Sequence, residues 1–138
     1  MNAEPKILRT SELLPPELLN GLLELSTQLE KASVDYGESA YEYANADHDY
    51  RRAKAMSYLK AVTEDKPKPR REQRTIPAIE ATRDIECEPQ RLAERLARAH
   101  KEACKERVES ARAQMSAYQT VVNALRAELE LAGRGPQR

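Results

Sequence analysis

The stretch DKPKPRREQR, from Asp65 to Arg74, interrupts a sequence that otherwise has the pattern of long helices. Pro67 and Pro69 cannot continue a helix, because proline lacks the backbone donor and clashes with the preceding turn. The charged residues around them favour exposure to water. The sequence therefore predicts a basic turn over residues 64–76.

The residues before this turn have the spacing of a long helix. Pro15 and Pro16 suit the first turn of a helix, and no further proline occurs between Pro16 and Pro67. Apolar side chains recur at steps of three and four residues, the seam of a coiled coil. We therefore predict a helix over residues 16–63, preceded by an irregular arm over residues 1–15. The predicted seam consists of Leu22, Leu25, Leu29, Tyr36, Tyr43 and Tyr50, with Ala32, Ser39, Ala46 and Ala53 in the alternate positions.

A second long helix is predicted after the turn. Pro77 and Pro89 can each begin a helical stretch, which gives a short helix over residues 77–88 and a long helix over residues 89–132. The glycines and the proline that follow predict a stop and a flexible tail over residues 133–138. The seam of this helix consists of Cys104, Val108, Ala111, Met115, Tyr118, Val122 and Leu125, with Ala97 and Leu129 at its ends.

Folding the chain back at the turn aligns the two seams. A turn centred near Arg70 pairs residues whose numbers add to about 140, such as Leu22 with Tyr118 and Leu25 with Met115. Several of these layers pair a large side chain with a small one. A slip of one heptad would also align the seams, so the sequence leaves the exact register open.

Charge supports the antiparallel orientation. Residues 28–49 carry six acids and one base, a net charge of −5, whereas residues 91–112 carry seven bases and four acids, a net charge of +3. The two segments face each other in the proposed register. Each exposed ion pair contributes only about 0.2–1 kcal/mol, so the pattern mainly selects the orientation.

Composition indicates an all-α protein with a thin core. The chain of 138 residues suggests one domain, over residues 16–132, and it contains no Phe and no Trp, the side chains that supply much of a typical core. We expect a long antiparallel helical hairpin, a coiled coil, that oligomerises into a helical bundle, with a homodimer favoured. The off-seam apolar residues that suggest a second contact face are Leu19, Leu23, Tyr41, Tyr58, Leu59, Leu92, Leu96 and Val121.

The sequence argues against an enzyme. Its four glycines are scattered, so it has no glycine-rich phosphate loop. Neither His48 nor His100 follows a Glu by three residues, as di-iron bundles require. His100 and Cys104 have a spacing that two zinc ligands can use, but zinc needs two more, and packing of Cys104 in the seam is the favoured interpretation. We predict no catalytic residue, no metal, no cofactor and no small-molecule substrate.

The cysteines and the apolar runs predict the compartment. Cys87 and Cys104 lie roughly 25 Å apart if one helix carries both, which is too far for a disulfide. No apolar run approaches the roughly 20 residues that a membrane-spanning helix needs. We therefore expect a reduced, cytoplasmic protein that does not associate with a membrane.

The basic turn is the clearest binding feature of the sequence. Residues 51–112 hold 17 bases and 11 acids, a net charge of +6, so this end could contact the phosphates of DNA or RNA. No aromatic side chain interleaves the bases for stacking on nucleobases, which favours the alternative of a solvated turn. The candidate contacts to nucleic acid or to a partner are Lys66, Lys68, Arg70, Arg71, Arg74, Arg51, Arg52 and Lys54.

Four segments carry a resemblance to a known group of proteins. They are YRRAKAMSYLKA (Tyr50–Ala61), TIPAIEA (Thr75–Ala81), Cys87, and NALRAELELA (Asn123–Ala132). These segments resemble small helical proteins from the early regions of tailed bacteriophages and prophages. The resemblance implies genes that lie near recombination and single-strand-binding genes. It implies no defined active site, so no functional residue is transferred.

These observations lead to two hypotheses about function. The first is a non-enzymatic structural or adaptor protein, encoded by a phage and acting in the bacterial cytoplasm, whose helical rod binds a second copy and a partner protein such as a host factor. The second is an accessory nucleic-acid-binding protein of phage recombination or replication that uses the basic turn.

Overall fold

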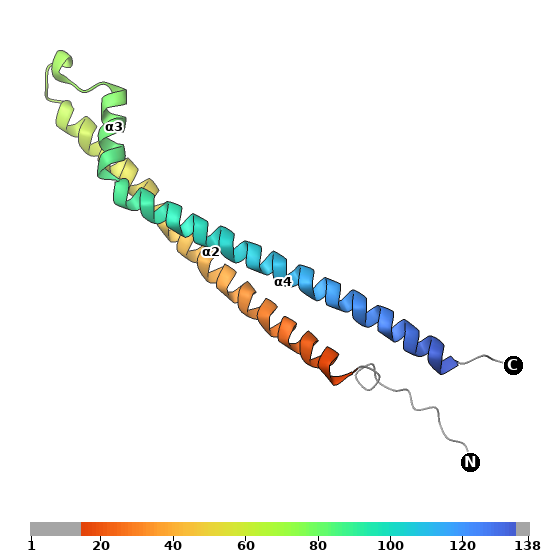
Figure 1. Cartoon of the computed structure of the whole chain (residues 1–138). Coiled ribbons are helices and arrows are strands. Elements are labelled where there is room, and N and C mark those ends of the chain that lie inside the picture. The colour runs from red at the N-terminus through yellow and green to blue at the C-terminus, as the bar shows by residue number, and fades with distance from the viewer. Residues whose placement is uncertain (1–14, 135–138) are drawn as a thin grey trace. The chain divides into compact units, whose positions relative to one another are not determined.

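The computed structural model describes residues 15–134, and within that range its elements are all helical. They are α2 (Pro16–Asp65), the 3₁₀ turn η1 (Arg70–Glu72), α3 (Ile76–Glu86) and α4 (Glu88–Arg134) (Figure 1). The predicted all-α class is therefore confirmed. Among the described helices, none combines the length and the apolar character that a membrane crossing needs. Residues 1–14 of the predicted arm and residues 135–138 of the predicted tail lie outside the described residues.

The chain divides into two compact units, each of which contains parts of α2 and α4. Among the described residues, unit 1 contains residues 15–34 and 106–134, and unit 2 contains residues 35–105. The sequence analysis predicts a single domain over residues 16–132, and this stays a prediction.

In unit 1 the start of α2 packs antiparallel against the last part of α4. The residues that are buried there are small or β-branched: Ala32 of α2 and Val108, Ala111 and Val122 of α4. Tyr118 lies over Gly21 so closely that a methyl group at this glycine would overlap the tyrosine hydroxyl. This contact is close to the predicted register, in which Leu22 lies opposite Tyr118.

In unit 2 the second part of α2 packs antiparallel against the start of α4, and α3 lies beside the end of α2 (Figure 1). Ser39 of α2 and Cys104 of α4 are the most deeply buried side chains, each with 1% of its surface exposed. Ile79 of α3 is also buried, and Ser57 of α2 donates a hydrogen bond of 2.7 Å to Glu86 Oε2. The buried Ile79 side chain and this hydrogen bond therefore help to hold α3 against α2.

The ends of the helices differ by a few residues from the predicted bounds. α2 continues two residues past Thr63, because the helical conformation is disfavoured only at Lys66, the residue before Pro67. α3 begins at Ile76 because Thr75 caps it, with its hydroxyl accepting a hydrogen bond of 3.4 Å from Ala78 N. α4 runs through Gly133 to Arg134, so the first two residues of the predicted tail are helical. Glycine lowers helix stability without preventing the helix.

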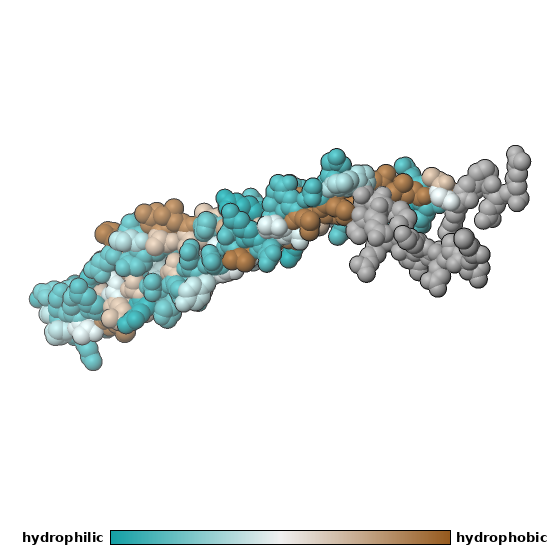
Figure 2. Space-filling view, turned by 90° about the horizontal axis from the view of Figure 1, so that it is seen from below, coloured by the Kyte–Doolittle hydropathy of each residue, from teal (hydrophilic) through white to brown (hydrophobic). Residues whose placement is uncertain are grey.

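The surface mixes polar side chains with separate hydrophobic patches. Figure 2 shows hydrophobic areas interspersed with hydrophilic ones on one face of the molecule. The large apolar side chains with exposed surface include Leu23 and Val121 in unit 1 and Tyr41, Leu59, Leu92 and Leu96 in unit 2. These six belong to the eight residues predicted to form a second contact face, and Leu19 and Tyr58 are half-buried.

The two interior glycines of α2 provide a test of the packing in unit 1. Replacing Gly37 by Ala meets no atom within 4 Å, so we expect the free energy of unfolding to rise by about 1 kcal/mol, the difference in helix propensity. Replacing Gly21 by Ala gives the same gain in propensity but forces the Tyr118 ring from its position. We expect a net loss of stability for this variant in urea-induced unfolding.

The control for this prediction is the same substitution without the tyrosine ring. In a Tyr118→Ala background, Gly21→Ala should recover a gain close to that of Gly37→Ala. If Gly21→Ala stabilises the wild-type chain as much as Gly37→Ala does, the placement of Tyr118 over Gly21 is wrong.

Candidate functional site

The basic turn of unit 2 connects α2 to α3, and several backbone hydrogen bonds fix its conformation. Lys66 N donates to Val62 O at 3.0 Å and Lys68 N donates to Asp65 O at 3.0 Å, which closes the last turn of α2. Glu72 N then donates to Pro69 O at 2.8 Å within η1. None of the three residues of η1 is buried, so the turn has no apolar core of its own.

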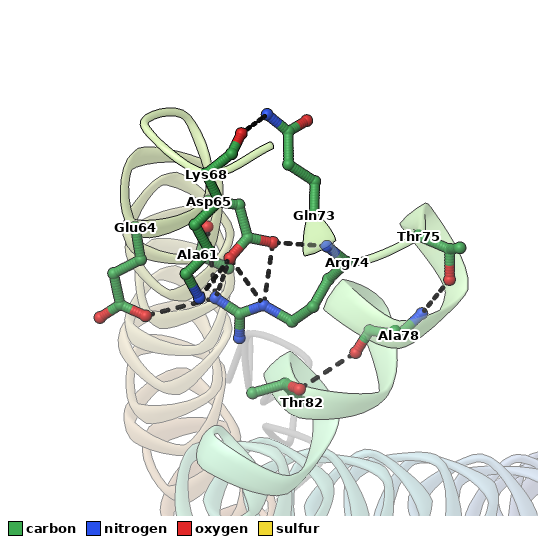
Figure 3. Close-up of polar contacts among 9 residues, drawn as sticks. All are labelled: Ala61, Glu64, Asp65, Lys68, Gln73, Arg74, Thr75, Ala78 and Thr82. Atoms are coloured by element: carbon green, nitrogen blue, oxygen red, sulfur yellow. Dashed lines mark hydrogen bonds and ion pairs between the residues drawn. The ribbon is translucent and has the colours of Figure 1, made fainter. Parts of the chain in front are cut away.

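Asp65 and Arg74 hold the turn closed (Figure 3). Arg74 N donates to Asp65 Oδ2 at 2.8 Å, and Arg74 Nε donates to the same oxygen at 3.0 Å. A terminal nitrogen of the guanidinium donates to Asp65 Oδ1 at 3.1 Å and to Ala61 O at 3.3 Å. Asp65 is only 4% exposed, so its carboxylate is enclosed by donors from a residue nine positions further along the chain.

This geometry shifts the pKa values of both groups. The hydrogen bonds from the Arg74 side chain and then from the Arg74 backbone lower the pKa of Asp65 from 3.8 to about 2. The hydrogen bond to Asp65 in turn raises the pKa of Arg74. Both groups are therefore charged at neutral pH, and the pair acts as a fixed ionic bridge between the end of α2 and the start of α3.

Four of the candidate bases share the turn with Arg74. Lys66, Lys68, Arg70 and Arg71 are all exposed, and Lys68 Nζ lies 3.6 Å from Asp65 Oδ1. Arg74 itself has a structural role, because its donors are directed at Asp65, Glu64 and Ala61. The turn therefore presents a compact group of four cations to solvent.

The other three candidate bases belong to a different part of α2. Arg51 lies fourteen residues before Asp65, a distance of about 21 Å along a helix. Its Nε forms an ion pair of 3.1 Å with Asp47. Lys54 is half-buried, with its ammonium 4.2 Å from the centre of the Tyr50 ring. Of this group, Arg52 is exposed to solvent and has no ion pair within residues 15–134.

The predicted seam residues lie along the packed faces of α2 and α4. All thirteen are buried or half-buried, nine of them in unit 1 and four in unit 2. In unit 2, Tyr43 of α2 receives two cations of α4, with Lys101 Nζ 4.8 Å and the Arg98 guanidinium 5.8 Å from the centre of the ring. Arg98 also pairs with Glu94, a carboxylate with 4% of its surface exposed.

Both cysteines are buried and free. Cys104 Sγ lies 3.8 Å from His100 Nε2, the pair considered above as zinc ligands. No group of three His, Cys, Asp or Glu side chains that could hold a metal ion occurs among residues 15–134. Burial raises the pKa of Cys87, which joins α3 to α4. These positions are consistent with thiols that serve packing.

Each unit also has a shallow groove along its helices. The groove of unit 1 has a volume of about 520 Å³ and is lined by Gly21, Leu25, Tyr118 and Val121 among others. The groove of unit 2 has a volume of about 420 Å³ and is lined by Glu42, Asn45, Asp49 and Gln90 among others.

Sequence reasoning missed the polar residues that organise unit 2. Asp65, Ser57 and Glu94 are all buried, although their residue types are usually exposed. A signal for Glu94 existed, because the steps of three and four residues that run back from Cys104 through Ala97 reach Glu94 and Gln90 next. No comparable signal identifies the partner of Asp65, which depends on the path of the turn.

Comparison with known proteins adds no relative. No family model matches the chain, and no curated protein or solved structure matches it either.

The Asp65–Arg74 bridge predicts a pH dependence of stability. The pKa of Asp65 is lower in the folded chain than the ordinary value of 3.8, so the bridge stabilises the fold above pH 3.8 and loses its effect as the pH falls to about 2. An Asp65→Asn variant lacks the charge at every pH. We expect its melting temperature to lie below that of the wild type at neutral pH, and the difference to shrink as the pH falls from 3.8 to about 2.

Asp49→Asn is the matched control, because Asp49 is an exposed aspartate of the same unit with no ion pair in the described part of the chain. Its melting temperature should follow that of the wild type across this range. A constant difference between Asp65→Asn and the wild type down to pH 2 would contradict the assignment of the bridge.

Proposed function

We propose that the chain is a non-enzymatic structural or adaptor protein, encoded by a tailed bacteriophage or prophage. In this proposal it acts in the cytoplasm of the bacterial host and binds proteins through the outer faces of α2 and α4. The two helices form an antiparallel coiled coil, and two such chains associate into a helical bundle. The chain needs neither a metal nor a cofactor for this role.

The observation that carries the proposal is the exposure of large apolar side chains on both long helices. Leu23 is 67% exposed, Leu59 62% and Leu96 63%, although leucine is usually among the most buried residue types. Helices that pack through one narrow stripe leave their other faces available, and large apolar side chains exposed on those faces can be buried when another protein binds. The ion pairs of unit 2 support the same role. Arg74 is paired with Asp65 and Arg98 with Glu94, so these charges are already neutralised within the chain.

Self-association and its dependence on these side chains provide the test. We expect sedimentation equilibrium to give twice the 15.7 kDa mass of the chain at high protein concentration. A Leu59→Gln, Leu92→Gln, Leu96→Gln variant should sediment as a single chain, because it loses apolar surface that the interface would bury. Circular dichroism should show unchanged helix content, since these residues make little packing contact within the chain.

The same triple variant is the control for capture of a partner protein from the host. A partner that uses the outer faces should be retained by the wild type and lost by the variant. A wild-type chain that remains single at every concentration and retains no protein would refute the proposal.

A second function is supported by the turn itself. Lys66, Lys68, Arg70 and Arg71 are exposed together, and a compact group of cations is the minimum that phosphate recognition requires. In this alternative the chain is an accessory nucleic-acid-binding protein of phage recombination or replication. The bridge between Asp65 and Arg74 would hold the turn in one conformation, which lowers the entropy lost on binding.

Fluorescence anisotropy with labelled single-stranded and duplex DNA tests this alternative. If the turn binds phosphates, replacing Lys66, Lys68, Arg70 and Arg71 by Ala should weaken binding and flatten its dependence on salt, because fewer counterions are released. Arg74 is left in place, since it holds the turn closed. The control replaces four other exposed bases, Lys31, Lys105, Arg107 and Arg112, by Ala and has the same net charge. Equal binding by the two variants would exclude the turn as the site.

A further inference from the structure

The outer face of α4 in unit 2 carries a second apolar stripe. Leu92, Leu96, Ala99 and Ala103 follow one another at steps of four, three and four residues, which places them along one side of a helix. Leu92 is 55% and Leu96 63% exposed, Ala99 is exposed and Ala103 is half-buried. The opposite side of the same helix carries the stripe that is packed within the unit, which includes Cys104. The spacing of the outer stripe is therefore that of a helix with a second packing partner.

Two opposite charges border this stripe on the same side. Arg95 precedes Leu96, and Glu102 precedes Ala103, so both occupy the same position of the heptad. Both side chains are exposed, and neither forms an ion pair within residues 15–134. They are seven residues apart, about 10.5 Å along the helix, so they do not pair with each other within one chain.

We propose that a second copy of this chain docks antiparallel on this face of α4. This inference rests on the self-association put forward under the proposed function and identifies its surface. With the two-fold axis between Ala97 and Arg98, Leu96 lies opposite Ala99 of the second copy and Leu92 lies opposite Ala103. Each layer then pairs a large side chain with a small one. Arg95 of each copy meets Glu102 of the other, so the charge pair occurs twice.

The charges of Arg95 and Glu102 favour an antiparallel second copy of this chain on this face. A two-fold interface uses the same surface on both copies, so it must be complementary to itself, and the exchange of Arg95 for Glu102 across the axis meets that condition. Two parallel copies would place Arg95 level with Arg95 and Glu102 level with Glu102, which gains no ion pair. A stretch of four layers is small compared with the roughly 800 Å² per partner of a standard interface, so the dimer should be weak and reversible.

Charge exchange between two variants tests the register. Arg95→Glu alone places two pairs of like charges across the interface, and so does Glu102→Arg alone. We expect each variant to raise the dimer dissociation constant roughly tenfold at low salt. The reason is that two exposed contacts per dimer change from attraction to repulsion.

An equimolar mixture of the two variants should restore the dimer with the wild-type affinity. In a dimer of one chain of each kind, the introduced glutamate of the first chain meets the introduced arginine of the second. At the other contact, the unchanged Glu102 of the first chain meets the unchanged Arg95 of the second. Both contacts therefore join opposite charges again.

The control exchanges charges elsewhere in unit 2. Lys60→Glu and Glu80→Arg are changes at exposed residues of α2 and α3 and alter the net charge by the same amounts. They should dimerise as the wild type does, alone or mixed, which separates the register from attraction between oppositely charged chains. Circular dichroism on every variant reports whether the helices are kept.

The outcomes separate this inference from the proposed function. If the wild type dimerises and Arg95→Glu and Glu102→Arg dimerise equally well, or if their mixture does not recover dimers, this register is wrong while self-association stands. If the wild type sediments as a single chain at every concentration, both the register and the proposed self-association fail.

Discussion

The structure depends on a narrow stripe through which α2 and α4 pack against each other in each unit. Small side chains make this possible, because they allow two helix axes to approach closely. In unit 2 the stripe is most deeply buried at Ser39 and Cys104, and the Ser39 hydroxyl donates a hydrogen bond of 2.7 Å to Tyr36 O. Because α4 packs mainly through this stripe, its outer face in unit 2, with Leu92 and Leu96, is left in contact with water.

A second constraint acts where the stripe ends. The turn after α2 buries no apolar side chain in η1, so its conformation depends on polar contacts. Asp65 supplies them by accepting hydrogen bonds from both the backbone and the side chain of Arg74. A carboxylate that is this deeply buried loses its hydration, and only charged donors with good geometry offset that loss. Ser57 and Glu86 then extend the polar contact along α3.

The sequence predicted the elements of this fold well because prolines and periodicity act locally. Pro67 and Pro69 ended α2, and the steps of three and four residues placed the packed faces of both helices. What could not be predicted depends on contacts across the turn. Arg74 looked like one of several free bases, because its pairing with Asp65 exists only once the chain has turned. α3 begins one residue before the predicted start, because Thr75 caps the helix two positions ahead of Pro77.

These contacts also decide how the charges of the chain should be weighed. Of the eight bases considered as binding residues, Arg74, Lys68 and Arg51 have carboxylate partners in the described part of the chain, and Lys54 lies over a tyrosine ring. A count of basic residues therefore overstates the number of cations that are free to bind phosphates. Leu92 and Leu96 stay more than half exposed among residues 15–134, and burial of apolar surface contributes about 25 cal/mol per Å² with little dependence on salt. Contacts between exposed charges are weakened at physiological ionic strength. This comparison supports the proposed binding of a protein partner over the alternative of nucleic acid.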